Sequence, residues 1–202
     1  MQPQQRLREK KNAEVKRALY GAAMELFRNQ GFDRTTVDEI AARAGFSRAT
    51  FFNHFGTKEG VLRFYGQGLQ YLIDGIFHDS QVVAPLEVIR RLLLALVREA
   101  EARREEVKLI FTWSVRDPEY LFGQTPARKR VQEALGELVA RAQERQEVRR
   151  DIPASELVMH LLFIYQGVVF AIITGAGGAE PLFDSAWRFI LGGITDGRSP
   201  AC

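Results

Sequence analysis

Residues 35–62 constrain the fold of this chain more than any other stretch, because they contain two helix starts separated by a glycine. Thr36 and Glu39 have the spacing of a capping box, in which each side chain accepts a hydrogen bond from the other residue's backbone N–H. Apolar residues then recur at helical spacing, and Gly45 suits the left-handed backbone that ends many helices. We therefore predict a short amphipathic helix that ends at a turn.

A second short helix is predicted directly after that turn. Ser47 is a natural N-cap for a helix that begins at Arg48. Phe51 and Phe55 lie four residues apart, so both should face inward and leave the small and polar residues near the helix start exposed. Two short helices joined by a glycine turn indicate a helix-turn-helix, whose second helix can enter a DNA groove.

The next helix start and the charge distribution also favour binding to a polyanion. Thr57 can cap this helix, and Lys58 in its first turn would suit a phosphate, because helix N-termini attract anions. Residues 1–62 contain eleven Lys and Arg against seven Asp and Glu, whereas residues 63–202 contain seventeen against eighteen. A basic N-terminal third joined to a near-neutral body is typical of a nucleic-acid-binding module.

The order of these motifs resembles the N-terminal DNA-binding domain of the TetR family of bacterial transcriptional repressors. That family has a Thr-led helix, an Ala-Gly-Val/Phe-Ser turn, a Thr-Leu-Tyr-x-His-Phe segment and a Lys-Glu-x-Leu helix start. The corresponding residues here are Thr36, Ala44-Gly45-Phe46-Ser47, Thr50-Phe51-Phe52-Asn53-His54-Phe55 and Lys58-Glu59-Gly60-Val61-Leu62. The resemblance covers the first third of the chain.

The resemblance implies an all-α fold in two parts. An N-terminal arm and a three-helix helix-turn-helix DNA-binding domain would occupy residues 1–56. A fourth helix would join them to a helical effector-binding and dimerisation domain within residues 57–202. The implied function is a ligand-responsive repressor that binds a palindromic operator in double-stranded DNA as a homodimer.

Individual residues in the motif have expected roles at the DNA. Thr36 and Lys58 would hold phosphates, and Arg48 is the best candidate to recognise guanine, because its guanidinium can reach O6 and N7 together. Phe52 stands where the family usually has a tyrosine, so it can pack against sugar or a thymine methyl but cannot donate a hydrogen bond. The other residues expected at the DNA are Ser47, Ala49, Thr50, Asn53 and His54.

The segments on either side of this motif have less regular patterns. Residues 1–11 are polar and are predicted to be a loose arm that can contact DNA, followed by a first helix from Asn12 to about Gln30. The fourth helix is expected from Thr57 to about Leu72. Its several glycines favour either tight packing or a compliant joint, and as a hypothesis we assign the joint to Gly66 and Gly68.

The remaining sequence predicts a helical body. Helices are expected to start at Pro85, Pro126, Pro153 and Pro181, with another over Val107–Val115. The run from Leu157 to Ile173 is apolar on nearly all sides, which fits either a membrane span or a core helix covered by a partner chain. His160 and Gln166 interrupt this run, so we favour a buried, dimer-forming helix and no membrane contact. The family resemblance implies that the homodimer pairs through the last two helices.

The effector is less constrained than the DNA contacts. The family resemblance implies a pocket in the body, and the scarcity of charge on the Leu157–Ile173 helix favours a lipophilic effector, such as a fatty acyl compound like acyl-CoA or an aromatic. Aromatics at helical spacing are also common in a simple core. The candidate effector contacts are Phe64, Tyr71, Phe111, Trp113, His160, Phe163, Tyr165 and Phe170.

Other chemistry finds little support in the sequence. The histidines are scattered and the one cysteine is Cys202, so we expect neither a metal site nor a cofactor. No acid, base and nucleophile converge, which argues against an enzyme with an appended helix-turn-helix. The polar N-terminus lacks a secretory signal, which favours the cytoplasm. A DNA-binding dimer that responds to no ligand stays open as an alternative.

Overall fold

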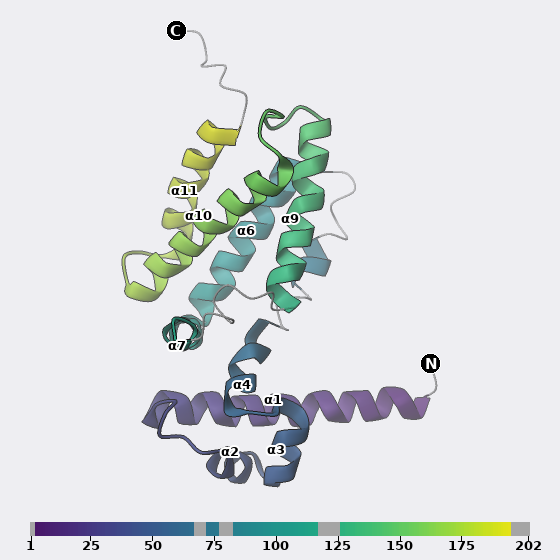
Figure 1. The fold of residues 1–202 in the computed structure, drawn as a ribbon, viewed down its shortest axis with the longest axis vertical. Helices are drawn as coiled ribbons and strands as arrows, with labels where there is room; N and C mark the ends of the chain where they lie inside the picture. The colour runs from purple at the N-terminus through teal and green to yellow at the C-terminus, as the bar shows by residue number, and fades with distance from the viewer. Residues whose placement is uncertain (1–2, 67–71, 77–82, 117–125, 195–202) are drawn as a thin grey trace. The chain divides into compact units, whose positions relative to one another are not determined.

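The computed structural model describes residues 3–66, 72–76, 83–116 and 126–194, which form helices and the turns between them (Figure 1). The chain divides into two compact units, Met1–Tyr65 and Gly66–Cys202, which we call the head and the body. The predicted all-α fold is confirmed. The assignment of DNA binding to residues 1–56 and effector binding to residues 57–202 stays a prediction.

The head begins with a helix that is longer than the sequence suggested. Helix α1 extends over Pro3–Gln30, so the prediction of a loose arm up to Lys11 is wrong. Residues 4–20 contain no glycine or proline and are rich in Gln, Arg, Lys, Glu and Ala, all of which favour a helix. The second half of α1 buries Leu19, Ala23 and Phe27 in the head, whereas residues 4–12 are exposed.

Two capped helices follow α1, as predicted. Helix α2 is Val37–Ala44, with Thr36 and Glu39 in a capping box and Gly45 in the left-handed conformation at φ 76°. Helix α3 is Arg48–Phe55, and the Ser47 side chain caps it. The Phe51 side chain is fully buried between these helices and their neighbours, which confirms its inward orientation.

The fourth helix is shorter than predicted. Helix α4 is Lys58–Arg63, capped by Thr57, and a 3-10 turn, η1, continues over Phe64–Gly66. Gly60 is explained by tight packing, because a Cβ atom there would overlap the Phe55 carbonyl oxygen. Gly68 lies outside the described residues, so the hinge hypothesis stays a prediction.

The described part of the body consists of five labelled helices and a short helical segment at residues 72–76, arranged around one apolar core. Helices α6 and α10 each pack against all four of the other labelled helices. The core includes Leu92, Leu96, Leu135 and Leu161, each buried almost completely. The helices are α6 (Pro85–Ala102), α7 (Arg104–Ser114), α9 (Pro126–Glu144), α10 (Ala154–Thr174) and α11 (Ala179–Ile194).

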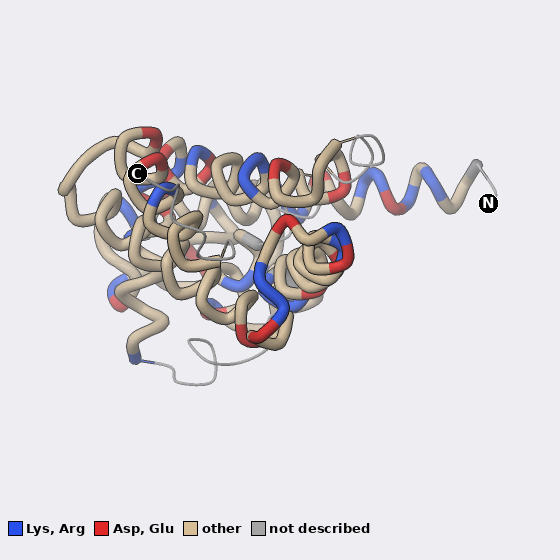
Figure 2. Tube along the Cα trace, turned by 90° about the horizontal axis from the view of Figure 1, so that it is seen from above, with Lys and Arg blue, Asp and Glu red and all other residues tan. Residues whose placement is uncertain are grey.

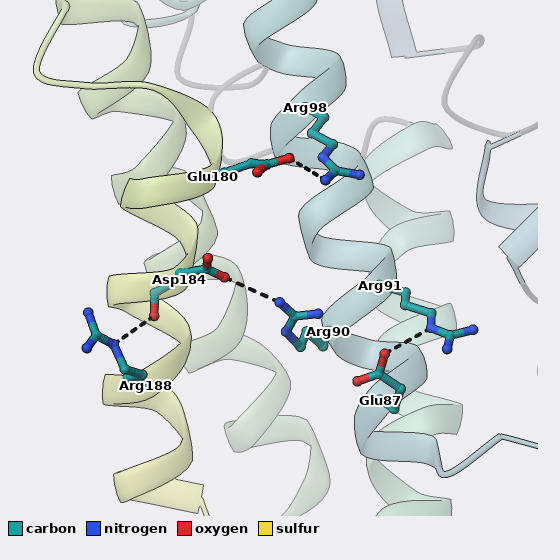
Figure 3. Close-up of polar contacts among 7 residues, drawn as sticks. All are labelled: Glu87, Arg90, Arg91, Arg98, Glu180, Asp184 and Arg188. Atoms are coloured by element: carbon teal, nitrogen blue, oxygen red, sulfur yellow. Dashed lines mark hydrogen bonds and ion pairs between the residues drawn. The ribbon is translucent and has the colours of Figure 1, made fainter.

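Helix α11 begins before the predicted Pro181 because another helix supplies its cap. The backbone N–H of Ala179 donates to Glu101 Oε1 at 2.9 Å, which satisfies one of the free donors of the first turn. Ion pairs then connect α11 to α6 (Figure 3): Asp184 lies 3.3 Å from Arg90, and Glu180 pairs with Arg98. These side chains are largely exposed, so they orient α11 more than they stabilise it.

Helix α10 has the length and apolar composition of a membrane span, although only 39% of its most apolar window is buried in the body. Its buried residues include Leu157, Leu161, Val168 and Ile172, which face the core at helical spacing. A core helix of a water-exposed domain has the same composition, so one such helix is weak support for a membrane span.

Candidate functional site

The start of α2 is held by reciprocal hydrogen bonds between Thr36 and Glu39. The Glu39 carboxylate accepts the Thr36 backbone N–H at 2.8 Å and the Thr36 hydroxyl at 2.9 Å, and Thr36 Oγ1 accepts the Glu39 N–H at 3.2 Å. Gln30 donates to the same carboxylate at 3.2 Å. These bonds lower the pKa of Glu39, and the backbone bond from Thr36 contributes most. A phosphate contact by Thr36 would require its hydroxyl to turn away from Glu39.

The start of α3 presents a small, mostly exposed face. Ser47 Oγ accepts the Thr50 backbone N–H at 3.1 Å and lies 2.9 Å from the Thr50 hydroxyl. Phe51 is buried on the opposite face, and its ring contacts those of Phe52 and Phe55 at centroid distances of 5.8 and 5.6 Å. The predicted groove-facing residues therefore lie on one surface, with Arg48, Ala49, Phe52 and Asn53 exposed and Thr50 partly buried.

Arg48 is positioned by two neighbours on this surface. Its guanidinium Nη1 lies 2.6 Å from Asp38 Oδ2, and its Cζ lies 5.4 Å from the centre of the Phe52 ring. The side chains of Arg48 and Asp38 are 61% and 62% exposed, so water screens their ion pair. The contact orients the guanidinium in the free protein, and little free energy is needed to redirect it.

Lys58 has a different environment from the one predicted. Its ammonium donates to the backbone carbonyls of Phe32 at 2.7 Å, Thr35 at 3.0 Å and Asp33 at 3.4 Å. It also lies 4.3 Å from the centre of the Phe32 ring. An ammonium has three N–H donors, and all three have acceptors in the loop between α1 and α2. Lys58 therefore joins the two ends of the helix-turn-helix, and its expected phosphate contact stays a prediction.

Asn53 and His54 lie beside residues of α1 that the sequence motif does not include. They line an open groove of about 550 Å³ together with Arg8, Asn12, Ala13 and Lys16 of α1. Three of the α1 residues, at positions 8, 12 and 16, share one helix face by their spacing. That spacing is visible in the sequence, but Arg8 fell within the predicted loose arm, where a side chain has no defined orientation.

The candidate effector residues are distributed over several places in the described part of the chain. Tyr165 lines a small, partly open apolar cavity of about 10 Å³, and burial raises its pKa to about 12. Phe111 and Phe170 contact each other at 5.4 Å between ring centroids, and Trp113 is partly buried. The cavity is lined by Leu93, Val97, Ile164, Tyr165, Val168, Phe183, Ala186 and Ile190.

The other candidate effector residues lie elsewhere. Phe64 belongs to the head, where its ring contacts Tyr20 and Phe55 at centroid distances of 5.2 and 5.7 Å. His160 is exposed and lies 3.7 Å from Glu156, and the Phe163 side chain is 60% exposed. Tyr71 is outside the described residues. A role in effector binding stays a prediction for each of these.

The head also matches a known protein family. The family model described as "Bacterial regulatory proteins, tetR family" matches residues 19–63, from the second half of α1 to the end of α4. The chain belongs to the TetR family. The resemblance predicted from the motifs between Thr36 and Leu62 is confirmed.

Relatives of this TetR-family chain match it over different lengths. The transcriptional repressor AcnR of Corynebacterium efficiens is 26% identical over 158 residues, covering 76% of this chain and 79% of AcnR. The uncharacterized regulator YerO of Bacillus subtilis is 26% identical over 106 residues. That match covers 50% of this chain and 37% of YerO, so the chain spans little more than a third of that relative.

A solved structure is similar over nearly the whole chain. FadR of Thermus thermophilus, a TetR-family transcriptional repressor crystallised with lauroyl-CoA, has a TM-score of 0.72 and 28% sequence identity. The match covers 93% of this chain and 98% of FadR. Together these comparisons identify the TetR-family chain as a transcriptional regulator and not an enzyme.

The Lys58 contacts predict a local effect on head stability. Lys58→Met keeps the aliphatic stem but leaves partly buried carbonyls without their donor, which should cost about 1–3 kcal/mol. Hydrogen exchange of peptides covering residues 31–44 should therefore become about 5- to 150-fold faster in the full chain. The matched control is Lys11→Met at an exposed position of α1. Equal exchange rates in the two variants would contradict a stabilising role of the Lys58 contacts.

Proposed function

We propose that this TetR-family regulator is a cytoplasmic repressor that binds a palindromic operator as a homodimer and is released by a lipophilic effector. The observation that supports DNA recognition is the exposed face at the start of α3. There Arg48, Ala49, Phe52 and Asn53 lie at the surface, and the buried Phe51 ring fixes the helix from behind. In helix-turn-helix proteins the N-terminal residues of the second helix contact base edges in the major groove.

Arg48 is the proposed guanine contact. Its guanidinium already lies at the surface, between the Asp38 carboxylate and the Phe52 ring. Because the Arg48–Asp38 pair is exposed, a bidentate contact with guanine O6 and N7 can replace it at small cost. In a symmetric dimer, two heads would place this contact at related positions of half-sites about one helical turn apart.

The proposed dimer interface lies on α10 and α11. Met159, Phe163 and Phe170 form a stripe along α10, with 46%, 60% and 48% of their surfaces exposed, and Phe189 on α11 is 76% exposed. Large apolar side chains gathered on two helices that pack together are a common sign of a protein–protein interface. A second copy of this face would cover them, as expected for pairing through the last two helices.

The proposed effector is a fatty acyl compound. Support comes from the lauroyl-CoA complex of the similar Thermus thermophilus FadR and from the apolar lining of the cavity beside Tyr165. That cavity is only about 10 Å³, so an acyl chain can enter only if α6, α10 and α11 separate locally. The Tyr165 hydroxyl is then the polar group nearest to an entering ligand, because the other lining residues are apolar.

Effector binding to the body can release the protein from the operator if the two events favour different conformations. An effector that binds the opened body better than the closed body shifts the population toward the opened state. Operator affinity falls by the ratio of the effector's affinities for the two states, and by no more. A DNA-binding dimer without a ligand would show the same operator contacts but no such shift.

Operator selection tests the DNA-binding proposal. The protein should select one palindrome from a random duplex pool, and Arg48→Ala should relax the base preference at one symmetric pair of positions. Removing a bidentate contact should cost about 1–3 kcal/mol for each half-site at those positions only. Fluorescence anisotropy with operators changed at single positions measures the loss of binding free energy at each position. A uniform loss at all positions would make Arg48 a phosphate contact, and no selection by the wild type would overturn the proposal.

Sedimentation equilibrium tests the proposed dimer. Phe163→Glu places a carboxylate in the apolar interface, so the dimer dissociation constant should rise at least about tenfold, since burying an unpaired charge costs more than about 1.4 kcal/mol. The control is Val115→Glu at the end of α7, where Val115 is 58% exposed and outside the α10–α11 face. An unchanged dissociation constant in Phe163→Glu would place the interface elsewhere.

Lauroyl-CoA titration tests the effector. It should release the wild-type protein from the selected operator, and Tyr165→Phe should raise the half-maximal concentration about 2- to 12-fold, the equivalent of one hydrogen bond. Tyr20→Phe in the head removes a hydroxyl without touching the cavity and should leave that concentration unchanged. Release without an effect of Tyr165→Phe would remove Tyr165 from the site. Absence of release would exclude lauroyl-CoA as the effector.

A further inference from the structure

An open groove in the head lies between the N-terminal half of α1 and the C-terminal end of α3. It has a volume of about 550 Å³, and its lining residues are Arg8, Asn12, Ala13, Lys16, Asn53 and His54. No Asp or Glu is among them. Figure 2 shows Lys and Arg recurring along the N-terminal turns of α1. The groove therefore combines two cations with amide and imidazole donors and no carboxylate.

The polar side chains of this groove are unused within the described part of the chain. Arg8, Asn12, Asn53 and His54 have no side-chain hydrogen bond or ion pair to any described residue. Three other cations of the head do have partners: Arg43 pairs with Glu25, Arg48 with Asp38, and Lys58 with three carbonyls. Donors left free side by side in one concave surface fit an external ligand that is rich in acceptors.

Lys16 is fixed in place at the edge of this groove without a carboxylate partner among the described residues. Its ammonium lies 4.7 Å from the centre of the Phe64 ring and 5.6 Å from that of Phe55. Partial burial lowers the pKa of Lys16, because the charged form loses hydration. A cation held by two rings loses little side-chain freedom on binding, and its interaction with an anion is screened less than at an open surface.

We propose that this groove binds the phosphodiester backbone of DNA, beside the base-reading start of α3. The proposal rests on the proposed DNA-binding function and deepens it. Arg8 and Lys16 supply charge, and the Asn12, Asn53 and His54 side chains can bond phosphate oxygens. Asn53 and His54 would then position the backbone, and base recognition would belong to the residues near Arg48. An apolar effector is a poor occupant, because five of the six lining side chains are polar.

The salt dependence of DNA binding separates a groove contact from a general effect of charge. Arg8→Gln and Lys16→Met are compared with Lys10→Gln, which removes the same charge from an exposed position of α1 outside the groove. Fluorescence anisotropy on a random-sequence duplex gives the slope of log K against log salt. Removing one phosphate interaction from each head of a dimer should lower the magnitude of that slope by about 1.8. Gln and Met both keep high helix propensity.

The expected result is this reduction in Arg8→Gln and in Lys16→Met and a much smaller one in Lys10→Gln. Lys16→Arg, which keeps the charge, should restore the wild-type slope. Equal reductions in all three neutral variants, or none in the groove variants, would overturn the proposal. Circular dichroism and thermal unfolding of each variant distinguish a missing phosphate interaction from an unfolded α1. If the wild type binds no duplex, the proposed DNA-binding function itself is wrong. If the wild type binds and all variants have the same salt slope, only the assignment of the groove to DNA phosphates is wrong.

Two measurements distinguish binding of the DNA backbone from binding of a free anion such as inorganic phosphate. Hydroxyl-radical footprinting of the selected operator should show fewer protected sugars in each half-site with Arg8→Gln and not with Lys10→Gln. Thermal unfolding in inorganic phosphate, against chloride at equal ionic strength, should shift wild type and Arg8→Gln alike. A phosphate-specific stabilisation that Arg8→Gln removes, with an unchanged footprint, would assign the groove to a small anion and overturn its assignment to DNA.

Discussion

Side-chain caps hold together two helices that are too short to persist alone, and the head depends on them. Helices α2 and α3 have eight residues each, well below the length at which an isolated helix is stable in water. The Thr36–Glu39 and Ser47–Thr50 bonds satisfy donors at both starts, and the buried Phe51 ring adds the apolar contact that fixes α3. The proposed base-reading surface is therefore preorganised by local bonds and one aromatic anchor.

Some cations of the head make contacts that stabilise the fold, whereas others lie at the surface. Lys58 is used to connect α4 with the loop before α2, a contact across more than twenty residues that closes the segment containing both short helices. Arg8 and Lys16 have no carboxylate partner among the described residues and face one groove. Net charge alone does not separate these roles, because a cation whose donors all have internal acceptors contributes to folding more than to binding.

Helix α10 has two apolar sides with different surroundings. One stripe of this helix, including Leu157, Leu161 and Ile172, fills the core, and another presents Phe163 and Phe170 at the surface. Both stripes are apolar, so the sequence looks apolar all round. An exposed apolar stripe is a common sign of an interaction surface, so the proposed dimer interface and the core would use different sides of the same helix.

The sequence alone determined the local structure of the head, because capping boxes, left-handed glycines and helical spacing act between residues three or four positions apart. Thr36, Gly45, Ser47 and Thr57 all have their predicted roles at helix ends. Arg48 lies at the surface as expected, although its partner Asp38 was not foreseen. These features and the all-α fold needed no knowledge of distant contacts.

Only the tertiary structure decided which side chains are used by the fold and which are left for a ligand. Lys58 matched a phosphate-binding pattern, yet carbonyls more than twenty residues away take its donors. Burial and donor occupancy depend on which segments meet in space, and residue spacing within one helix does not encode this.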